Sequence, residues 1–176
     1  MGGGGKIAFT NYRMQQCIKE DFSLKQLIGA DFTFACIHKL LFVEADITDA
    51  SLMFTGCWAT EFQKTIANRV NFSFADCWKS NFSDAIMKNA NFTSLHAREV
   101  KFCKTNLQGS SFRRAQLWDA NLRGANLQDV NFRGANLRGA DFTDANIEGA
   151  DFTGADMWET VGLEGQVGRK KFQIVK

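Results

Sequence analysis

The stretch from Ala120 to Met157 reads ANLRG ANLQD VNFRG ANLRG ADFTD ANIEG ADFTG ADM, one five-residue pattern repeated without a break. Each repeat begins with a small residue, continues with Asn or Asp, and places a large apolar residue third. Two variable residues complete it. Because self-similarity at a fixed period identifies repeat architectures, this period decides the fold before any helix or strand is assigned.

The frame extends far beyond this stretch. From Phe22 to Met157 every fifth residue occupies the large position, mostly as Phe, Leu, Ile or Met, which makes 28 repeats. Helices and strands have periods of 3.6 and 2, and coiled coils have a period of seven, so none of them explains the pattern. Two inward residues in every five predict a solenoid that turns regularly.

Two longer periods set the size of one coil. Phe at the large position recurs every ten residues over much of the chain, which fits either two or four sides per coil. The four tryptophans decide between them, because each follows a large position and they differ by multiples of twenty: Trp58, Trp78, Trp118 and Trp158. The sequence therefore predicts an all-β, quadrilateral parallel β-helix of about seven coils, each of four pentapeptides. At the usual spacing of strands, this rod is about 34 Å long, with Phe ladders on two opposite walls.

The residue two after the large position predicts the turns. In the second half this residue is often Gly, for example Gly124 and Gly134, which suits a turn with a positive φ. The first half has Asp49, Arg69 and Asn89 at equivalent places, so we expect turns of another type there.

Both ends depart from the pattern. Residues 1–20 are interpreted as a flexible leader and an atypical N-terminal cap, because Gln15 and Glu20 stand where small residues are needed. Residues 21–159 form the predicted β-helix. Residues 160–176 form a basic tail, which either folds back as a cap over the acidic last coil or frays.

The composition gives no sign of a catalytic or metal-binding site. The net charge is only +2, and Pro is absent, as expected where backbone N–H groups are needed in ladders. The five cysteines lack metal-binding spacing, so we interpret them as reduced thiols of a cytoplasmic protein, with Cys57 and Cys77 stacked in the core without a disulfide. His38 and His96 lie nearly three coils apart, too far to share a metal. We predict no enzymatic activity, no cofactor, no metal, no small-molecule substrate and no membrane span.

One outward-facing column is more informative than the repeat, because the fold does not require its aromatic residues. We predict that it contacts a protein, with these members: His38, Trp58, Trp78, Arg98, Trp118, Arg138 and Trp158. A second outer column, Phe34, Phe54 and Phe74, runs at the edge just before this side. Contiguous apolar surface of this kind marks contacts. The competing interpretation is that the indoles stack along the rod with Arg98 and Arg138 between them through cation–π attraction.

Repeats such as ANLRG and ADFTD resemble those of the pentapeptide repeat family, over roughly Ala30 to Met157. The resemblance implies that the coil is right-handed. Members of the family are mostly bacterial and abundant in cyanobacteria. One group within it protects DNA gyrase from quinolones as an acidic dimer shaped like duplex DNA.

Two functions compete. The first is a non-enzymatic interaction scaffold that presents the Trp/Arg column and the Phe edge to a protein partner or to a second copy in a homodimer. The alternative is a DNA-mimicking gyrase protection protein, which the net charge of +2 opposes. We do not expect nucleic-acid binding, because the basic residues between Lys101 and Arg138 spread over at least three sides of the rod.

Overall fold

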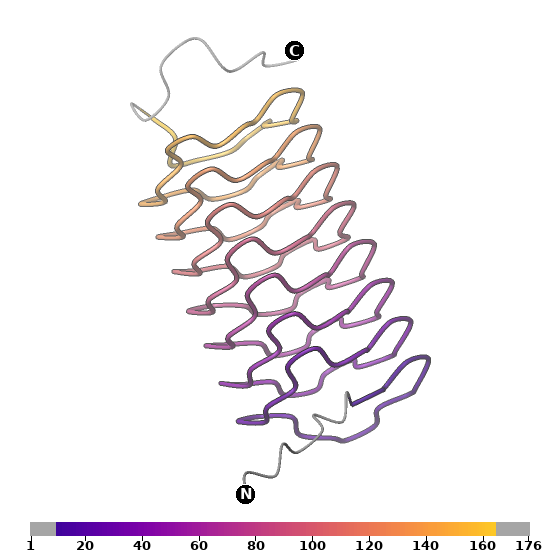
Figure 1. The fold of residues 1–176 in the computed structure, drawn as a ribbon. Helices are drawn as coiled ribbons and strands as arrows, with labels where there is room; N and C mark the ends of the chain where they lie inside the picture. The colour runs from indigo at the N-terminus through magenta and orange to yellow at the C-terminus, as the bar shows by residue number, and fades with distance from the viewer. Residues whose placement is uncertain (1–9, 165–176) are drawn as a thin grey trace, which may run out of the picture.

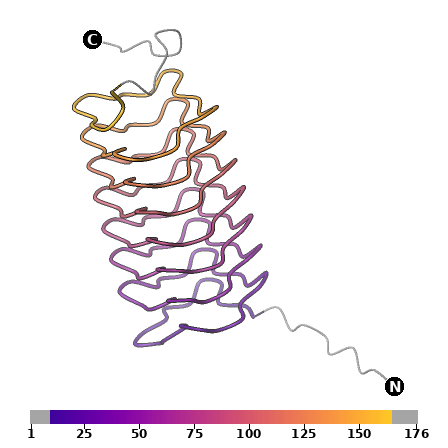
Figure 2. The same cartoon turned by 90° about the vertical axis from the view of Figure 1, so that its left-hand side faces the viewer.

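The computed structural model describes residues 10–164, which form a rod of stacked four-sided coils (Figure 1). The chain climbs by one coil every twenty residues, and a view turned by 90° shows the same regular stack (Figure 2). Parallel bridges join each residue at the Asn or Asp position to the residue twenty further on, as in Asp31 to Ser51 and Asn91 to Ser111. The predicted right-handed quadrilateral β-helix with a twenty-residue coil is confirmed.

Each side of a coil is too short for a longer strand. The described residues contain isolated bridges at every fifth position from Asn11 to Val161, and no helix. No helix among them could therefore cross a membrane. The coils are nevertheless joined by many backbone hydrogen bonds. The N–H of each bridging residue donates to the previous coil, and the N–H of the residue after it donates to the next coil. Ser51 N–H donates to Ala30 in the coil before (2.9 Å), and Leu52 N–H donates to Asn71 in the coil after (2.7 Å).

The turns correct one prediction. Asp49, Arg69 and Asn89 have φ values of 59°, 56° and 56°, in the same left-handed region as Gly124 at 63°. The first half of the rod therefore uses the same turn as the second half. A left-handed residue with a side chain costs roughly 1–2 kcal/mol. The ladder imposes it, because the N–H of Asp49 must point along the axis to reach the carbonyl of Asn68 (3.0 Å).

The core consists of two aromatic ladders, as predicted. Rings on one wall stack along the axis, as in Phe62 and Phe82, whose centroids lie 4.7 Å apart at an interplanar angle of 1°. Rings of the opposite wall meet them edge to face, as in Phe62 and Phe72 at 5.5 Å and 89°. Both arrangements are favourable for aromatic quadrupoles, and all three side chains are fully buried.

The remaining positions of the repeat have structural roles. The Asp or Asn side chain accepts a hydrogen bond from the backbone two residues on, as in Thr33 N–H to Asp31 Oδ1 (2.9 Å). Where Thr replaces Ala at the small position, its hydroxyl donates to a backbone carbonyl, either of the previous coil, as in Thr55 to Phe32 (2.8 Å), or three residues earlier, as in Thr65 to Phe62 (2.9 Å). The recurring carboxylates and amides are therefore part of the scaffold.

Cys57 and Cys77 form a disulfide between neighbouring coils, which corrects the prediction of two reduced thiols. The stack places their Cα atoms 4.8 Å apart, within the range that a disulfide spans. Both side chains face inward and Cys57 is fully buried. The spacing of the coils alone makes this bond feasible, whatever the compartment.

The coil geometry is present near both ends of the described range. Asn11 and Gln16 bridge to Asp31 and Cys36, and Tyr12 stacks on Phe32 at 4.5 Å. Residues 1–9 of the predicted leader and N-terminal cap (residues 1–20) lie outside the described residues. So do the basic side chains of the predicted tail, which are Arg169, Lys170, Lys171 and Lys176.

Candidate protein-contact surface

The Trp column is the line of outward residues that follow the large position on one side of the rod. It consists of Ile18, His38, Trp58, Trp78, Arg98, Trp118, Arg138 and Trp158. Trp78 and Trp118 are each 42% exposed and Trp158 is 58% exposed, whereas Trp58 is half-buried. The next residue of each coil completes the turn, so the column occupies one corner of the rod, which we call the Trp corner.

Trp58 is less exposed because His38 lies beside it. The two rings have centroids 5.1 Å apart, and His38 Nδ1 accepts a hydrogen bond from the backbone N–H of Trp58 (3.2 Å). Gly56 makes room for this arrangement, because a Cβ added there would lie 2.6 Å from His38 Cε1. The role of Gly56 was not predicted from the sequence. Its signal was a glycine at a position of the coil that is elsewhere Cys, Asp, Asn, His or Gln.

Lysines, and not the predicted arginines, pair with the indoles. Lys39 Nζ lies 4.5 Å from the centroid of Trp58, and Lys79 Nζ lies 4.7 Å from that of Trp78. Among residues 10–164, Arg98 instead faces the carboxylates of Glu99 and Asp119 at 3.4 and 3.9 Å. Lys79 follows Trp78 in the same turn, whereas Lys39 reaches Trp58 from the coil before, so lysines of the turn can contact an indole on their own coil or on the next one.

Arg138, the second arginine of the Trp column, likewise faces a carboxylate. Its guanidinium lies 3.9 Å from Asp156, in an exposed ion pair. Exposed pairs at this distance contribute little to stability. Arg138 therefore stays available for contacts at the surface.

The Phe column runs along the corner before this side. Phe34, Phe54 and Phe74 stack at centroid distances of 4.9 and 5.0 Å, within 9° of parallel. Each is between 44% and 50% exposed. The two corners bound one face of the rod, so aromatic side chains line both of its edges in the N-terminal half.

A groove opens on the Trp corner where Arg98 interrupts the indoles. It encloses about 410 Å³ and is lined by Trp78, Arg98 and Trp118, together with Asp76, His96, Ala97 and Gln116. The two indoles belong to coils two steps apart, so they stand about 9.6 Å apart along the axis. Arg98 lies at the level between them, so two indoles and a guanidinium line the groove.

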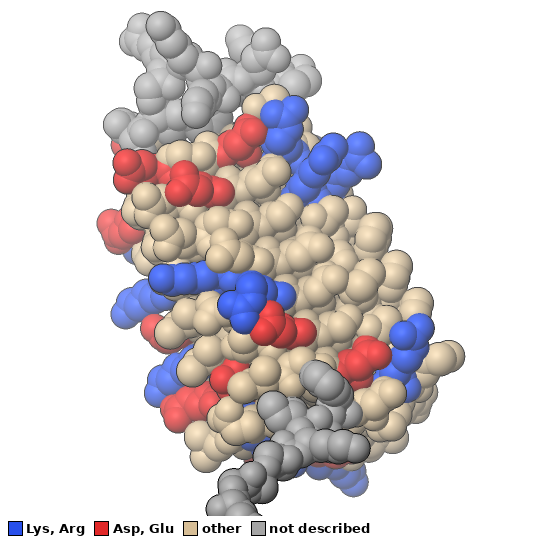
Figure 3. Space-filling view, viewed as in Figure 1, with Lys and Arg blue, Asp and Glu red and all other residues tan. Residues whose placement is uncertain are grey.

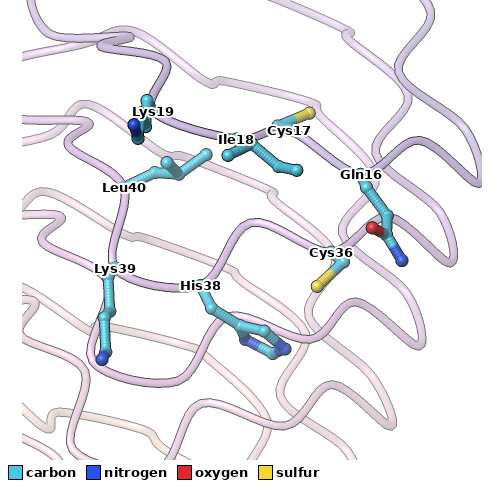
Figure 4. Close-up of a pocket in the computed structure, with 8 residues that line it drawn as sticks. All are labelled: Gln16, Cys17, Ile18, Lys19, Cys36, His38, Lys39 and Leu40. Carbon is cyan, nitrogen blue, oxygen red and sulfur yellow. The ribbon is translucent and has the colours of Figure 1, made fainter.

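A second hollow lies at the N-terminal end of the same corner (Figure 4). It measures about 310 Å³, and Ile18, Lys19, His38 and Lys39 are among its lining residues. Cys17 also borders it, but burial, followed by the nearby Glu20 and Cys36, raises the pKa of this thiol to about 11. A thiol with that pKa is protonated at neutral pH and is a poor nucleophile.

The other candidate groups among the described residues are metal ligands and histidines. Residues 10–164 contain no group of three or more His, Cys, Asp or Glu side chains able to hold a metal ion. His38 and His96 lie on separate coils. The pKa of His38 is lowered by burial, partly offset by Asp76. The arrangement is suited to contact with another macromolecule through aromatic and cationic side chains.

Acidic and basic side chains are mixed on the surface of the rod. On the face in Figure 3, Asp and Glu side chains alternate with Lys and Arg around a broad uncharged area. Several arginines pair with a carboxylate of the next coil, as in Arg123 with Asp141 (3.1 Å) and Arg133 with Asp151 (3.2 Å). This face does not present the uniformly acidic surface that a DNA mimic needs.

The fold and the surface define a repeat solenoid with an aromatic corner. Residues 68–102, 96–129 and 120–158 match the sequence profile of pentapeptide repeats in eight copies, and the chain belongs to the pentapeptide repeat family. No curated protein matches the sequence significantly.

Several solved structures are similar to this chain. QnrB1, a plasmid-mediated fluoroquinolone resistance protein, aligns with a TM-score of 0.73 at 21% identity, covering 80% of this chain and 71% of that chain. A pentapeptide repeat protein from the Arabidopsis thaliana thylakoid lumen aligns with a TM-score of 0.53 at 29% identity, covering 55% and 67%. HetL, a pentapeptide repeat protein from the cyanobacterium Nostoc, aligns over 90% of this chain and 78% of that chain at 23% identity, with a TM-score of 0.34.

Proposed function

We propose that this protein is a non-enzymatic scaffold that binds a protein through its Trp corner. The observation that carries this proposal is the line of three exposed indoles, Trp78, Trp118 and Trp158, on one corner of a rigid rod. Tryptophan and arginine are the residue types most enriched among those that dominate binding energy. The repeat needs neither of them at this position.

The Phe column extends the proposed surface to the opposite edge of the same face. Three stacked rings that are about half exposed leave apolar area in contact with water, which is unfavourable in an isolated molecule. A partner that covers both corners would bury this area. The rigid coils lose little conformational entropy on binding, because the hydrogen-bond ladder already fixes the backbone.

The competing function, protection of gyrase by DNA mimicry, has weaker support. The likeness to QnrB1 at 21% identity concerns the fold. The net charge of +2 and the mixed surface oppose mimicry of a polyanion. A gyrase supercoiling assay with and without a quinolone tests it, and we expect no protection.

The location in the cell stays a prediction. The sequence favours the cytoplasm, whereas disulfides such as Cys57–Cys77 are rare in reducing compartments. Complete burial of Cys57 shields the bond from reductants, so the two observations are compatible.

The test of the scaffold function replaces Trp78 and Trp118 by Ala together. We expect an unchanged circular dichroism spectrum and loss of protein contacts, measured by light scattering and by pull-down. The matched control replaces Ile66 and Ile86 by Ala; their side chains are 42% and 43% exposed on another face of the rod. Equal binding by the tryptophan variant and the parent would place the contact elsewhere. Unfolding of the tryptophan variant would make the column structural.

A further inference from the structure

We propose that the Trp corner binds a second copy of this chain, with the two rods antiparallel and a two-fold axis between the levels of Trp78 and Arg98. This inference rests on the proposed function and names the partner. It follows from the order of charges along the corner, from the groove beside Arg98, and from the positions of the aromatic residues about one midpoint.

Charge is segregated along the second column of the Trp corner, which consists of the residues that directly follow the Trp column. Its N-terminal half carries Lys19, Lys39 and Lys79, and its C-terminal half carries Glu99, Asp119 and Glu159. Two parallel copies of such a column would place like charges opposite each other, which is unfavourable. Two antiparallel copies place a lysine opposite a carboxylate at two of the four levels, Lys79 with Glu99 and Lys19 with Glu159. The other two levels pair Lys39 with Gly139 and Asp119 with Ala59, so no like charges meet.

The register follows from this pattern. With the axis midway between the levels of Lys79 and Glu99, each Lys79 faces Glu99 of the second copy, in addition to Glu99 of its own chain at 3.5 Å. At the ends of the contact, each Lys19 faces Glu159 of the second copy. Such a two-fold contact is closed, so it produces a dimer and not a filament.

The same register pairs the Trp column with itself. Trp78 lies opposite Arg98 of the second copy, and Trp58 lies opposite Trp118 of the second copy. Each Trp78 would enter the groove of about 410 Å³ that Trp78, Arg98 and Trp118 line on the other copy. There its ring meets a guanidinium, a favourable cation–π partner, between two indoles.

The arginines of the C-terminal half do not oppose this arrangement. Arg98 is held by Glu99 and Asp119, and Arg138 faces Asp156 at 3.9 Å. In the dimer Arg98 faces Trp78 of the second copy, and Arg138 faces His38 of the second copy. Each cation therefore meets an aromatic ring and no lysine.

The test exploits a pair of residues that cannot meet within one chain. Lys19 and Glu159 are seven coils apart, about 34 Å along the axis. We expect the parent to show a dimer mass by light scattering over a concentration series. Lys19→Glu alone and Glu159→Lys alone should each weaken the dimer at least tenfold, because like charges then face each other at both ends. An equimolar mixture of the two variants should restore it, because every end pair is again Glu opposite Lys.

Matched controls carry the same charge changes on the opposite corner of the rod. Lys88→Glu, Glu148→Lys and their mixture should all dimerise as the parent does, since both residues are exposed there. A parent that stays monomeric, or a mixture that fails to recover the dimer, overturns the antiparallel contact. If the parent is monomeric but Trp78→Ala with Trp118→Ala still abolishes capture of another protein, the scaffold function stands and only the self-contact fails.

Discussion

The imidazole of His38 accepts a hydrogen bond at Nδ1 from the backbone N–H of Trp58, one coil further along the rod (3.2 Å). The acceptor role requires that Nδ1 carry no proton, so the neutral ring with hydrogen on Nε2 is the form that fits. Burial lowers the pKa of His38 from its ordinary value of 6.5, in the same direction. This pair fixes the half-buried indole at the N-terminal side of the Trp corner.

The first prediction concerns pH. Because the folded-state pKa of His38 is lowered, the unfolded chain binds the proton more readily, and the contribution to stability is present above pH 6.5 and lost as pH falls below it. We expect a loss of less than about 1 kcal/mol, since solvent screens a ring that is only partly buried. Urea titrations at about pH 7.5 and about pH 5.5 measure it. His38→Gln should lose less stability between these pH values than the parent, and an equal loss would assign the effect to other groups.

The second prediction concerns Gly56. Its replacement by Ala places a methyl group 2.6 Å from His38 Cε1, so the ring must move and its bond with Trp58 is lost. We expect a cost of about 1 kcal/mol, the typical value of one hydrogen bond. Urea titration of Gly56→Ala, His38→Ala and the double variant forms a cycle. If the two effects simply add, the methyl group does not act through His38.

The architecture was predictable because one constraint is repeated in every coil. A residue such as Phe92 must face inward, and an inward side chain every fifth residue leaves few folds that satisfy all of them. The same repetition hid the turn type. Arg69 is a poor left-handed residue when judged alone, yet the ladder sets its φ at 56°, the same value as for Asn89, a residue type that tolerates this region. Local preference was overridden by hydrogen bonds that only the stacked structure reveals.

The candidate surface was predictable only in outline. The period of twenty places Trp78 and Trp118 on one line, but their sequence positions do not show that a groove opens between them. Likewise the partner of Trp78 is Lys79, in the same turn, because the left-handed residue directs its side chain back over the indole. Such side-chain directions depend on backbone geometry that periodicity does not supply.

The third prediction concerns the Cys57–Cys77 disulfide. A bond that closes a loop of about twenty residues stabilises a fold by about 3 kcal/mol in the chain-entropy description. We expect dithiothreitol to lower the free energy of unfolding of the parent by up to that amount, after slow reduction because Cys57 is fully buried. A variant with Ala at both positions should be insensitive to the reductant. Equal sensitivity of that variant would implicate Cys17, Cys36 or Cys103, the free cysteines of the described range.

The last prediction compares two phenylalanines that each stack between two other phenylalanines, one in the buried core and one on the exposed surface. Phe92 stacks between Phe72 and Phe112 at 5.5 and 4.5 Å inside the rod, where it is fully buried. Phe54 stacks between two rings of the Phe column at 4.9 and 5.0 Å outside the rod, where it is 44% exposed. Both substitutions to Ala therefore remove a ring that has one stacked ring on each side.

Phe92→Ala should cost about 3–5 kcal/mol, because the coils above and below are fixed by the ladder and cannot close the cavity. Phe54→Ala should cost at most about 1 kcal/mol, since water fills the space and only ring stacking is lost. Denaturant titrations of the two variants at one pH provide the comparison. Similar losses would mean that stacking along the axis, and not burial within the coils, is the main source of stability. In that case the outer Phe column would be a structural element of the rod and would no longer support a binding surface.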